Sequence, residues 1–452
     1  MSSRTRPRFQ GLWRHPDFLK LWTGQSVSVF GSLITRAALP IVAVLTLHAN
    51  AAQVALIYAA QVAPTLAFGL FAGALADRVR RRPLLIVADV GRALTLASIP
   101  LAAVTGSLSL NLIYLVTLLT SALSALFDIA YPAYLPSLIG PERLLEGNAK
   151  MGASMSVAEV AGFGLAGALV QALTASGAVL VDIATYVVSI VSLGLIRTRE
   201  PEPAHGREAQ GDEDASGQAL ARLRRDVVEG LRLTWRQPTR RALAGVALVQ
   251  ALCGGMLEPV FYIFVLRDLG VSPAIATATF AVGGAASFLG ATLTERVTRR
   301  LGMRRTLRLS ALMGACFALL IPLAGGPFWL AVTMLMATQL GDMVYTIYGI
   351  AQTTTLQRVS PSAALGRITA SIQFVAGLAT VVGLGLSAEL GQLIGARYTL
   401  LLATLGMLLG PLWLMLERIQ PEQAYSEAEG EQDEPPTPDA ALPEPAGKIS
   451  AP

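Results

Sequence analysis

Charged residues are scarce in this chain of 452 residues. Asp, Glu, Lys and Arg together make up 14% of the sequence, against 53% for hydrophobic residues, whereas soluble domains usually carry roughly 25% charged residues. So few charges cannot cover a water-facing surface on a chain of this length, which excludes an ordinary soluble protein. A lipid bilayer as the main partner explains the deficit, because side chains that face lipid need no charge.

The residue types on which most enzymes and metal sites depend are also few. The sequence has three His and two Cys, and it contains no nucleophile beside a base and no cluster of metal ligands. Cys253 and Cys316 both lie inside apolar runs, so neither resembles half of a disulfide or a metal ligand. A nucleotide-binding loop of the form G-x-x-x-x-G-K-[ST] is absent. We therefore predict no enzymatic activity, no cofactor and no direct use of ATP.

Long apolar runs stand in place of these features. A membrane-spanning helix needs about 20 mostly apolar residues, and we find twelve such runs. They predict an all-α membrane protein of about twelve transmembrane helices in two six-helix halves. The runs begin near Leu21, Ala52, Pro83, Leu108, Met155, Gly177, Leu243, Pro273, Thr306, Phe328, Ile368 and Tyr398.

Arg and Lys gather on one side of this predicted membrane protein. The segment before the first run and those after each even-numbered run hold nearly all of them, including residues 78–82 and 296–305, whereas the other loops offer only Arg267 and Arg397. Basic loops stay in the cytoplasm, so we predict that both termini are cytoplasmic in a multi-pass inner-membrane protein. The formal net charge of +5 then reflects membrane topology, and we predict no binding of nucleic acid.

The sequence divides into five predicted segments. Residues 1–19 form a cytoplasmic N-terminal segment, residues 20–196 the first half, residues 197–241 a cytoplasmic linker, residues 242–418 the second half, and residues 419–452 a disordered acidic tail. The second part of the linker is predicted to be a basic amphipathic helix, which most often lies in the lipid headgroup region; binding of a partner protein is the alternative. Its apolar positions recur at helical spacing at Leu220, Leu223, Val227 and Leu231.

An internal repeat supports the two halves. The segment GALADRVRRRPLL begins at Gly73, after the second run, and GATLTERVTRRLGMRR begins at Gly290, after the eighth. Each has a Gly at the end of a helix, then an acid, then an Arg cluster. Parallel repeats of this kind are a transporter architecture.

These residues resemble the major facilitator superfamily, in which the loop between the second and third helices carries the motif G-x-L-a-D-r-x-G-r-K/R. The chain is most similar to its bacterial drug-efflux branch, which includes macrolide and enterobactin exporters, on the segments FGSLITRAALP, VADVGRAL and LFDIAYPAYLPSLIGPERLLEGNA. The resemblance spans about residues 10–418 and implies alternating access, and a monomer suffices for this architecture. The loop motif corresponds here to Gly73, Leu75, Asp77, Arg78, Arg81 and Arg82, with Arg80 in place of the usual second Gly.

The fifth helix departs from the exporters of this superfamily. These proteins often carry a Gly-Pro-x-x-Gly-Gly element, whereas residues 162–167 read GFGLAG. The small residues still allow close approach of helices, but the absence of Pro weakens the inference of antiport.

Ionisable residues inside the spans are the candidates for function, because a charge within the hydrocarbon is costly. Removal from water disfavours the charged form of a carboxyl, so such a group could bind and release a proton. We predict that Asp182 or Glu258 couples transport to protons and that Arg36 either acts on that carboxyl or contacts the substrate; the alternative is a fixed buried ion pair. The predicted proton and substrate cavity comprises Arg36, Glu159, Asp182, Glu258 and Asp342.

A second predicted group forms a cytoplasmic gate. Asp89 and Arg92 lie about one turn apart and can pair, and Asp77 could bind the N-terminal end of a helix from the other half. For the Arg residues of this loop, retention in the cytoplasm is the competing interpretation. The predicted gate comprises Gly73, Asp77, Arg78, Arg81, Asp89, Arg92 and Asp128.

The leading interpretation is a secondary transporter that exports amphipathic small molecules in exchange for protons. Export of one endogenous compound, such as a siderophore or a lipid-like metabolite, is the main alternative, and proton-coupled nutrient uptake is a third. A membrane scaffold or sensor that transports nothing would leave the charges within the spans unexplained.

Overall fold

The structure is a computed structural model that describes residues 11–69, 80–140, 143–198, 215–361 and 364–416. These residues form helices joined by short connections, with no strand among them. In lipid every backbone polar group must be satisfied within the protein, which a helix does within one segment. The all-α prediction is therefore confirmed for the described chain.

The first half is built from a short 3-10 helix and six longer helices, with bounds close to the predicted runs. The connection between the last two is a single residue, Thr174, which has a positive φ of 66°. The elements are η1 (Gly11–Arg14), α1 (Pro16–Leu45), α2 (Ala51–Gly69), α4 (Arg81–Val104), α5 (Leu110–Ile139), α6 (Leu144–Leu173) and α7 (Ala175–Gly194).

The linker helix and the second half follow. Three of the predicted spans in this half are interrupted, each at a break of one or a few residues. The elements are α8 (Ala215–Arg236), α9 (Pro238–Ile263), η3 (Phe264–Asp268), α10 (Pro273–Leu301), α11 (Met303–Ala318), α12 (Leu320–Leu323), α13 (Phe328–Thr338), α14 (Gly341–Arg358), α15 (Leu365–Leu393), α16 (Ala396–Met407) and α17 (Leu409–Leu416).

The described residues include 10 helices, counted across small breaks, that are long and apolar enough to cross a membrane, or up to 11 if the bent α6 counts as one span. The helix α2 is a shorter apolar helix, and residues 70–79 that follow it lie outside the described residues. The count of twelve spans remains a prediction, as does the cytoplasmic position of the termini. The linker helix, predicted from its apolar spacing, is present as α8 and ends two residues before α9 begins.

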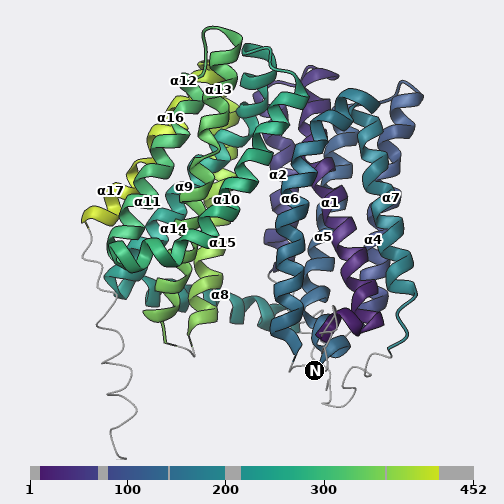
Figure 1. Ribbon diagram of the computed structural model, residues 1–452, viewed down its shortest axis with the longest axis horizontal. Helices are drawn as coiled ribbons and strands as arrows, with labels where there is room; N and C mark the ends of the chain where they lie inside the picture. Colours follow the sequence, from purple (N-terminus) through teal and green to yellow (C-terminus); the bar gives the residue numbers. More distant parts are fainter. Residues whose placement is uncertain (1–10, 70–79, 141–142, 199–214, 362–363, 417–452) are drawn as a thin grey trace, which may run out of the picture.

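The two halves lie side by side, and α8 lies between them at the end of the bundle where α1 starts (Figure 1). We call this end, at which α1, α4 and α11 start and which carries Arg80, Arg81, Arg304 and Arg305, the Arg-rich end. Two helix pairs make the main contacts between the halves, since α10 packs along α6 and α15 packs along α2, and α9 also contacts α1 and α2.

A hydrophobic core is shared between the halves only at the end opposite the Arg-rich end. This shared core contains the last turns of α1, the start of α2, the end of α9 with η3, and parts of α10, α15 and α16. At the Arg-rich end, the described buried residues form separate clusters, one around Phe18 and Phe127 in the first half and two in the second. The halves are thus joined by apolar packing at one end and separately packed at the other.

Close backbone contacts reinforce the shared core. A side chain at Gly167 of α6 would collide with the carbonyl of Pro273 on α10, and one at Gly391 of α15 would collide with Ala51 of α2. The guanidinium of Arg267 donates a hydrogen bond of 2.6 Å from Nη2 to the carbonyl oxygen of Val44 in the other half. Small residues at helix crossings are the usual means of association in lipid, where apolar burial drives little.

The two halves end alike, because in each half an Arg side chain binds carbonyl oxygens at the end of the last helix. Arg82 on α4 donates from Nε and Nη2 to the carbonyl oxygens of Leu193 (2.8 Å) and Gly194 (2.7 Å) at the end of α7. Arg308 on α11 donates in the same way to Leu414 (2.9 Å) and to Met415 (3.2 Å) of α17. The last carbonyls of a helix have no partner within it, so one Arg in each half satisfies them.

Two glycines of α15 provide a test of this packing. A Cβ at Gly383 would collide with the backbone of Leu252 on α9, whereas a Cβ at Gly385 would meet nothing within 4 Å. We expect Gly383→Ala to destabilise the protein by about 1–3 kcal/mol, the usual cost of overpacking, and Gly385→Ala to leave its stability unchanged or slightly improved. Thermal aggregation of the two variants in detergent measures the difference, and equal midpoints would contradict the α9–α15 contact.

Candidate functional site

A cavity of about 540 Å³, lined almost wholly by the first half, brings together three of the residues predicted for the proton and substrate cavity. Its lining comes from α1, α2, α4, α5, α6, α7 and α9, and Glu258 is the one residue of the second half among the lining residues. Arg36 on α1, Asp182 on α7 and Glu258 on α9 all face it. The structure thus places these three residues around one cavity, and their part in proton coupling and substrate binding stays a prediction.

Asp182 is the most enclosed of the three, with a side chain 1% exposed. One carboxylate oxygen, Oδ1, accepts a hydrogen bond of 3.2 Å from Thr185 Oγ1, and the other, Oδ2, has no partner among the described residues. Gly31 of α1 makes this position possible, because a Cβ there would collide with Thr185 and lie 2.6 Å from Asp182 Oδ1. Asp182 is thus held at the α1–α7 crossing with an oxygen left for a further partner.

Arg36 and Glu258 face the cavity from opposite halves. Both side chains are exposed to it, and Arg36 acts electrostatically on Glu258. Arg36 forms no ion pair with any described carboxylate, so its charge is available to other groups in the cavity. A cation and two acids with unused hydrogen-bonding capacity therefore line one enclosed space.

Asp89 and Arg92 form the predicted pair within α4, and both side chains are buried. Ser189 Oγ donates a hydrogen bond of 2.6 Å to Asp89 Oδ2. The guanidinium of Arg92 lies between two aromatic rings, 4.6 Å from the centroids of both Phe127 and Tyr186. Cation–π contacts of this kind add to the ion pair when they are desolvated, so this cluster holds α4, α5 and α7 together.

The structure describes only some of the other residues of the predicted gate. Asp128 on α5 lies with Arg92 on the wall of the central cavity, and Arg81 lies at the start of α4. Gly73, Asp77 and Arg78 lie outside the described residues, as does the side chain of Glu159. The gate thus remains a prediction.

Asp342 does not join the central cavity, contrary to the prediction. It lines a second cavity of about 260 Å³ inside the second half, with Gln250, Gln339 and Tyr345. The reason is the break between α13 and α14, which puts Asp342 in the first turn of α14. There its carboxylate packs on α10 at Gly283, where a side chain would collide with it.

Uncharged polar side chains form much of the cavity wall, and the sequence analysis missed them. They fall at helical spacing, three, four or seven residues apart, so each set lies on one face of its helix. That spacing was the available signal. The sets are Gln25, Ser28 and Ser32 on α1, and Thr117, Thr120, Ser121 and Ser124 on α5.

The groups that line the central cavity are those of a binding site. The central cavity offers hydroxyls, amides, aromatic rings and charges of both signs to a small molecule. No group of three or more His, Cys, Asp or Glu in the described residues could hold a metal ion. Such a lining suits a small molecule that has polar, aromatic and apolar parts.

The buried pair in α4 gives a stability prediction. Asp89→Asn leaves the Arg92 charge buried and unpaired, which usually costs about 3–5 kcal/mol. Glu295→Gln is the matched control, since it removes the acid of a helical pair with Arg299 (3.6 Å) in which both side chains are more than 70% exposed. Exposed pairs contribute little. We expect a large fall in the midpoint of thermal unfolding for Asp89→Asn alone; similar falls would contradict a structural role for the pair.

Comparison with known proteins places this fold in a family. The profile of the Major Facilitator Superfamily matches residues 21–384. The chain is 27% identical over 401 residues to the multidrug efflux pump Tap of Mycolicibacterium fortuitum, covering 86% of this chain and 93% of that protein. It is 24% identical over 420 residues to the uncharacterized MFS-type transporter YfiS of Bacillus subtilis (strain 168), covering 90% and 94%.

The fold also matches a solved structure. A bacterial homologue of the iron transporter ferroportin, in an inward-facing state, superposes with a TM-score of 0.70 at 16% identity, covering 90% of this chain and 99% of that one. At this identity the match concerns the fold alone. With the family profile across most of its length and the fold of a membrane transporter, the chain belongs to the Major Facilitator Superfamily.

Proposed function

We propose that this transporter exports amphipathic small molecules from the cytoplasm across the inner membrane in exchange for protons. The observation that carries the proposal is the central cavity, in which Arg36 and Asp182 of the first half lie with Glu258 of the second half, next to the core that the two halves share at one end. Proteins that move a solute by alternating access need such a site at the interface of two repeats.

The composition of the cavity favours an amphipathic substrate. Apolar and aromatic residues such as Val29, Leu33 and Phe127 alternate with hydroxyl and amide groups along its wall. Binding sites for small molecules are mostly apolar, with a few polar groups that fix orientation. The relation to a protein named as a multidrug efflux pump points in the same direction.

The direction of opening follows from the topology that we predict. The Arg-rich end is expected in the cytoplasm because basic loops remain there, and at that end each half has its own core. A cavity that is reached from the cytoplasm would load a substrate for export. The coupling energy is adequate, since about 2.3 kcal/mol per charge per 100 mV and about 1.4 kcal/mol per pH unit drive each proton inward.

The carboxylates have distinct roles in this proposal. Asp182 and Glu258 are the groups that would bind a proton when the cavity faces one side and release it on the other. Arg36 would stabilise the deprotonated carboxylates of the empty cavity, and would give way to a cationic or polar substrate group. Export of one endogenous siderophore or lipid-like compound uses the same geometry and differs only in the range of substrates.

Reconstitution into liposomes tests the coupling. Purified protein in vesicles that contain a pH-sensitive dye is exposed to a panel of lipophilic drugs. We expect substrate-dependent proton flux that falls at least tenfold in Asp182→Asn or Glu258→Gln, since a neutral amide cannot exchange a proton at the site. Glu389→Gln, at an exposed position of α15 that lines neither cavity, is the control and should transport normally.

Two outcomes contradict parts of the proposal. Drug transport without proton flux, or flux that is unchanged in both cavity variants, would rule out coupling through these carboxylates. Proton flux with one endogenous compound and with none of the drugs would replace the multidrug interpretation with a dedicated exporter.

A further inference from the structure

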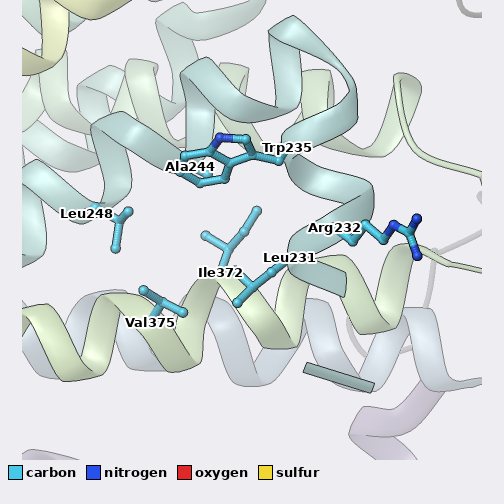
Figure 2. Close-up of a pocket in the computed structure, with 7 residues that line it drawn as sticks. All are labelled: Leu231, Arg232, Trp235, Ala244, Leu248, Ile372 and Val375. Carbon is cyan, nitrogen blue, oxygen red and sulfur yellow. The ribbon is translucent and has the colours of Figure 1, made fainter. Parts of the chain in front are cut away.

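A separate, apolar cavity lies beneath the linker helix α8. It has a volume of about 390 Å³ and is lined by Leu231, Arg232 and Trp235 of α8, Ala244 and Leu248 of α9, and Ile372 and Val375 of α15. In Figure 2 the side chains of Leu231, Ile372, Val375 and Leu248 surround this space, with the ring of Trp235 at its edge. The volume is in the range of pockets that hold one small ligand.

The helix α8 is fixed to α15 on one side of this pocket, which keeps the space open. Gly230 lies so close to α15 that a Cβ there would collide with Ser371, and Ser371 Oγ donates a hydrogen bond of 3.2 Å to the carbonyl of Val227. Arg367 and Glu229 form an ion pair of 2.8 Å beside this contact. The pocket begins directly beside this contact, at Leu231 and Ile372, the residues next to Gly230 and Ser371.

The residues that line the pocket favour a hydrocarbon chain as its ligand. Apart from Arg232, every lining residue is apolar or aromatic, so water finds almost no hydrogen-bond partners there. Protein interiors are otherwise close-packed. An unbranched hydrocarbon chain supplies the missing contacts and needs no hydrogen bonds.

The residues at the rim of the pocket favour a negatively charged group on the ligand. Arg232 and Arg236 are exposed and form no ion pair with any described residue, because the acid of this part of α8, Glu229, is already paired with Arg367. Figure 2 shows the guanidinium of Arg232 directed away from the apolar space. Trp235 is 50% exposed at the same rim. Trp and Arg are typical of the headgroup level of a membrane, and basic residues there attract anionic lipids.

We propose that this pocket binds one acyl chain of an anionic phospholipid, with the lipid phosphate on Arg232. The proposal rests on the pocket and its rim and is independent of what the protein transports. The bound lipid would fix the linker helix to both α9 and the bilayer surface, so the linker between the halves would be anchored on the second half.

Quenching of Trp fluorescence by brominated lipid tests this proposal directly. The full chain is reconstituted in bilayers with increasing fractions of brominated phosphatidylglycerol or brominated phosphatidylcholine, and the signal of Trp235 is obtained by difference from the Trp235→Phe variant. We expect half-maximal quenching of Trp235 at about a fivefold lower fraction of the anionic lipid, the preference that one Arg near the surface provides.

Three variants define the site. Arg232→Gln should abolish the preference for the anionic lipid, whereas Arg225→Gln, an equally exposed Arg two turns earlier on α8, should keep it. Ala244→Phe should fill the pocket and remove the saturable quenching by both lipids. Val375→Phe fills the same space from α15 and serves if the first filling variant does not fold.

Other results overturn the proposal. Equal quenching by the two lipids, or a preference that survives Arg232→Gln, would exclude a headgroup site at this Arg. Saturable quenching that persists in both filling variants would exclude the pocket. Release of the brominated lipid from Trp235 by a transported drug would assign the pocket to substrate instead.

Discussion

The shared apolar core at one end of the bundle is the constraint on which the rest of this structure depends. In a bilayer, helices gain little from burial of apolar surface against each other and associate through close packing and hydrogen bonds. The contacts of Gly167 with Pro273 and of Gly391 with Ala51 provide that packing between the halves, and Arg267 adds a hydrogen bond. Toward the Arg-rich end each half has a core of its own, so the shared core is confined to one end.

The candidate site lies where that shared core gives way to the cavity. On α1, Ile34 and Ala37 belong to the shared core while Arg36 faces the cavity, and on α9 the same change occurs between Val260 and Glu258. A rocking motion that moved the closed end would therefore change which side of the membrane reaches these charges. This geometry connects the packing of the halves with the proposed coupling to protons.

The sequence predicted those features that depend on local pattern. The apolar runs predicted the helices, and the three-residue spacing of Asp89 and Arg92 predicted their ion pair. Both features depend only on residues that are close together in the sequence. The helix α6 begins at Leu144, well before the apolar run near Met155. Its first turns are polar and lie at the Arg-rich end, so the apolar run does not include them. A hydropathy pattern cannot show such an extension.

Features that depend on contacts between distant segments were not predictable. The position of Asp342 in its own cavity follows from the helix break before Gly341 and from the absence of a side chain at Gly283. The joining of the halves at one end follows from which helix faces pair, and the pocket beneath α8 from the approach of Gly230 to α15. In each case a tertiary contact, rather than a local preference, decides the result.

Distances across the two ends of the bundle test the central claim, that the halves rock about the cavity. Spin labels at Asn148 and Arg299 report the Arg-rich ends of α6 and α10, and labels at Asn50 and Gln392 report the joined end, in a chain without Cys253 and Cys316. Between pH 8 and pH 5 in bilayers, this account predicts that one distance shortens as the other lengthens. Two distances that stay constant, or that change in the same direction, would contradict it.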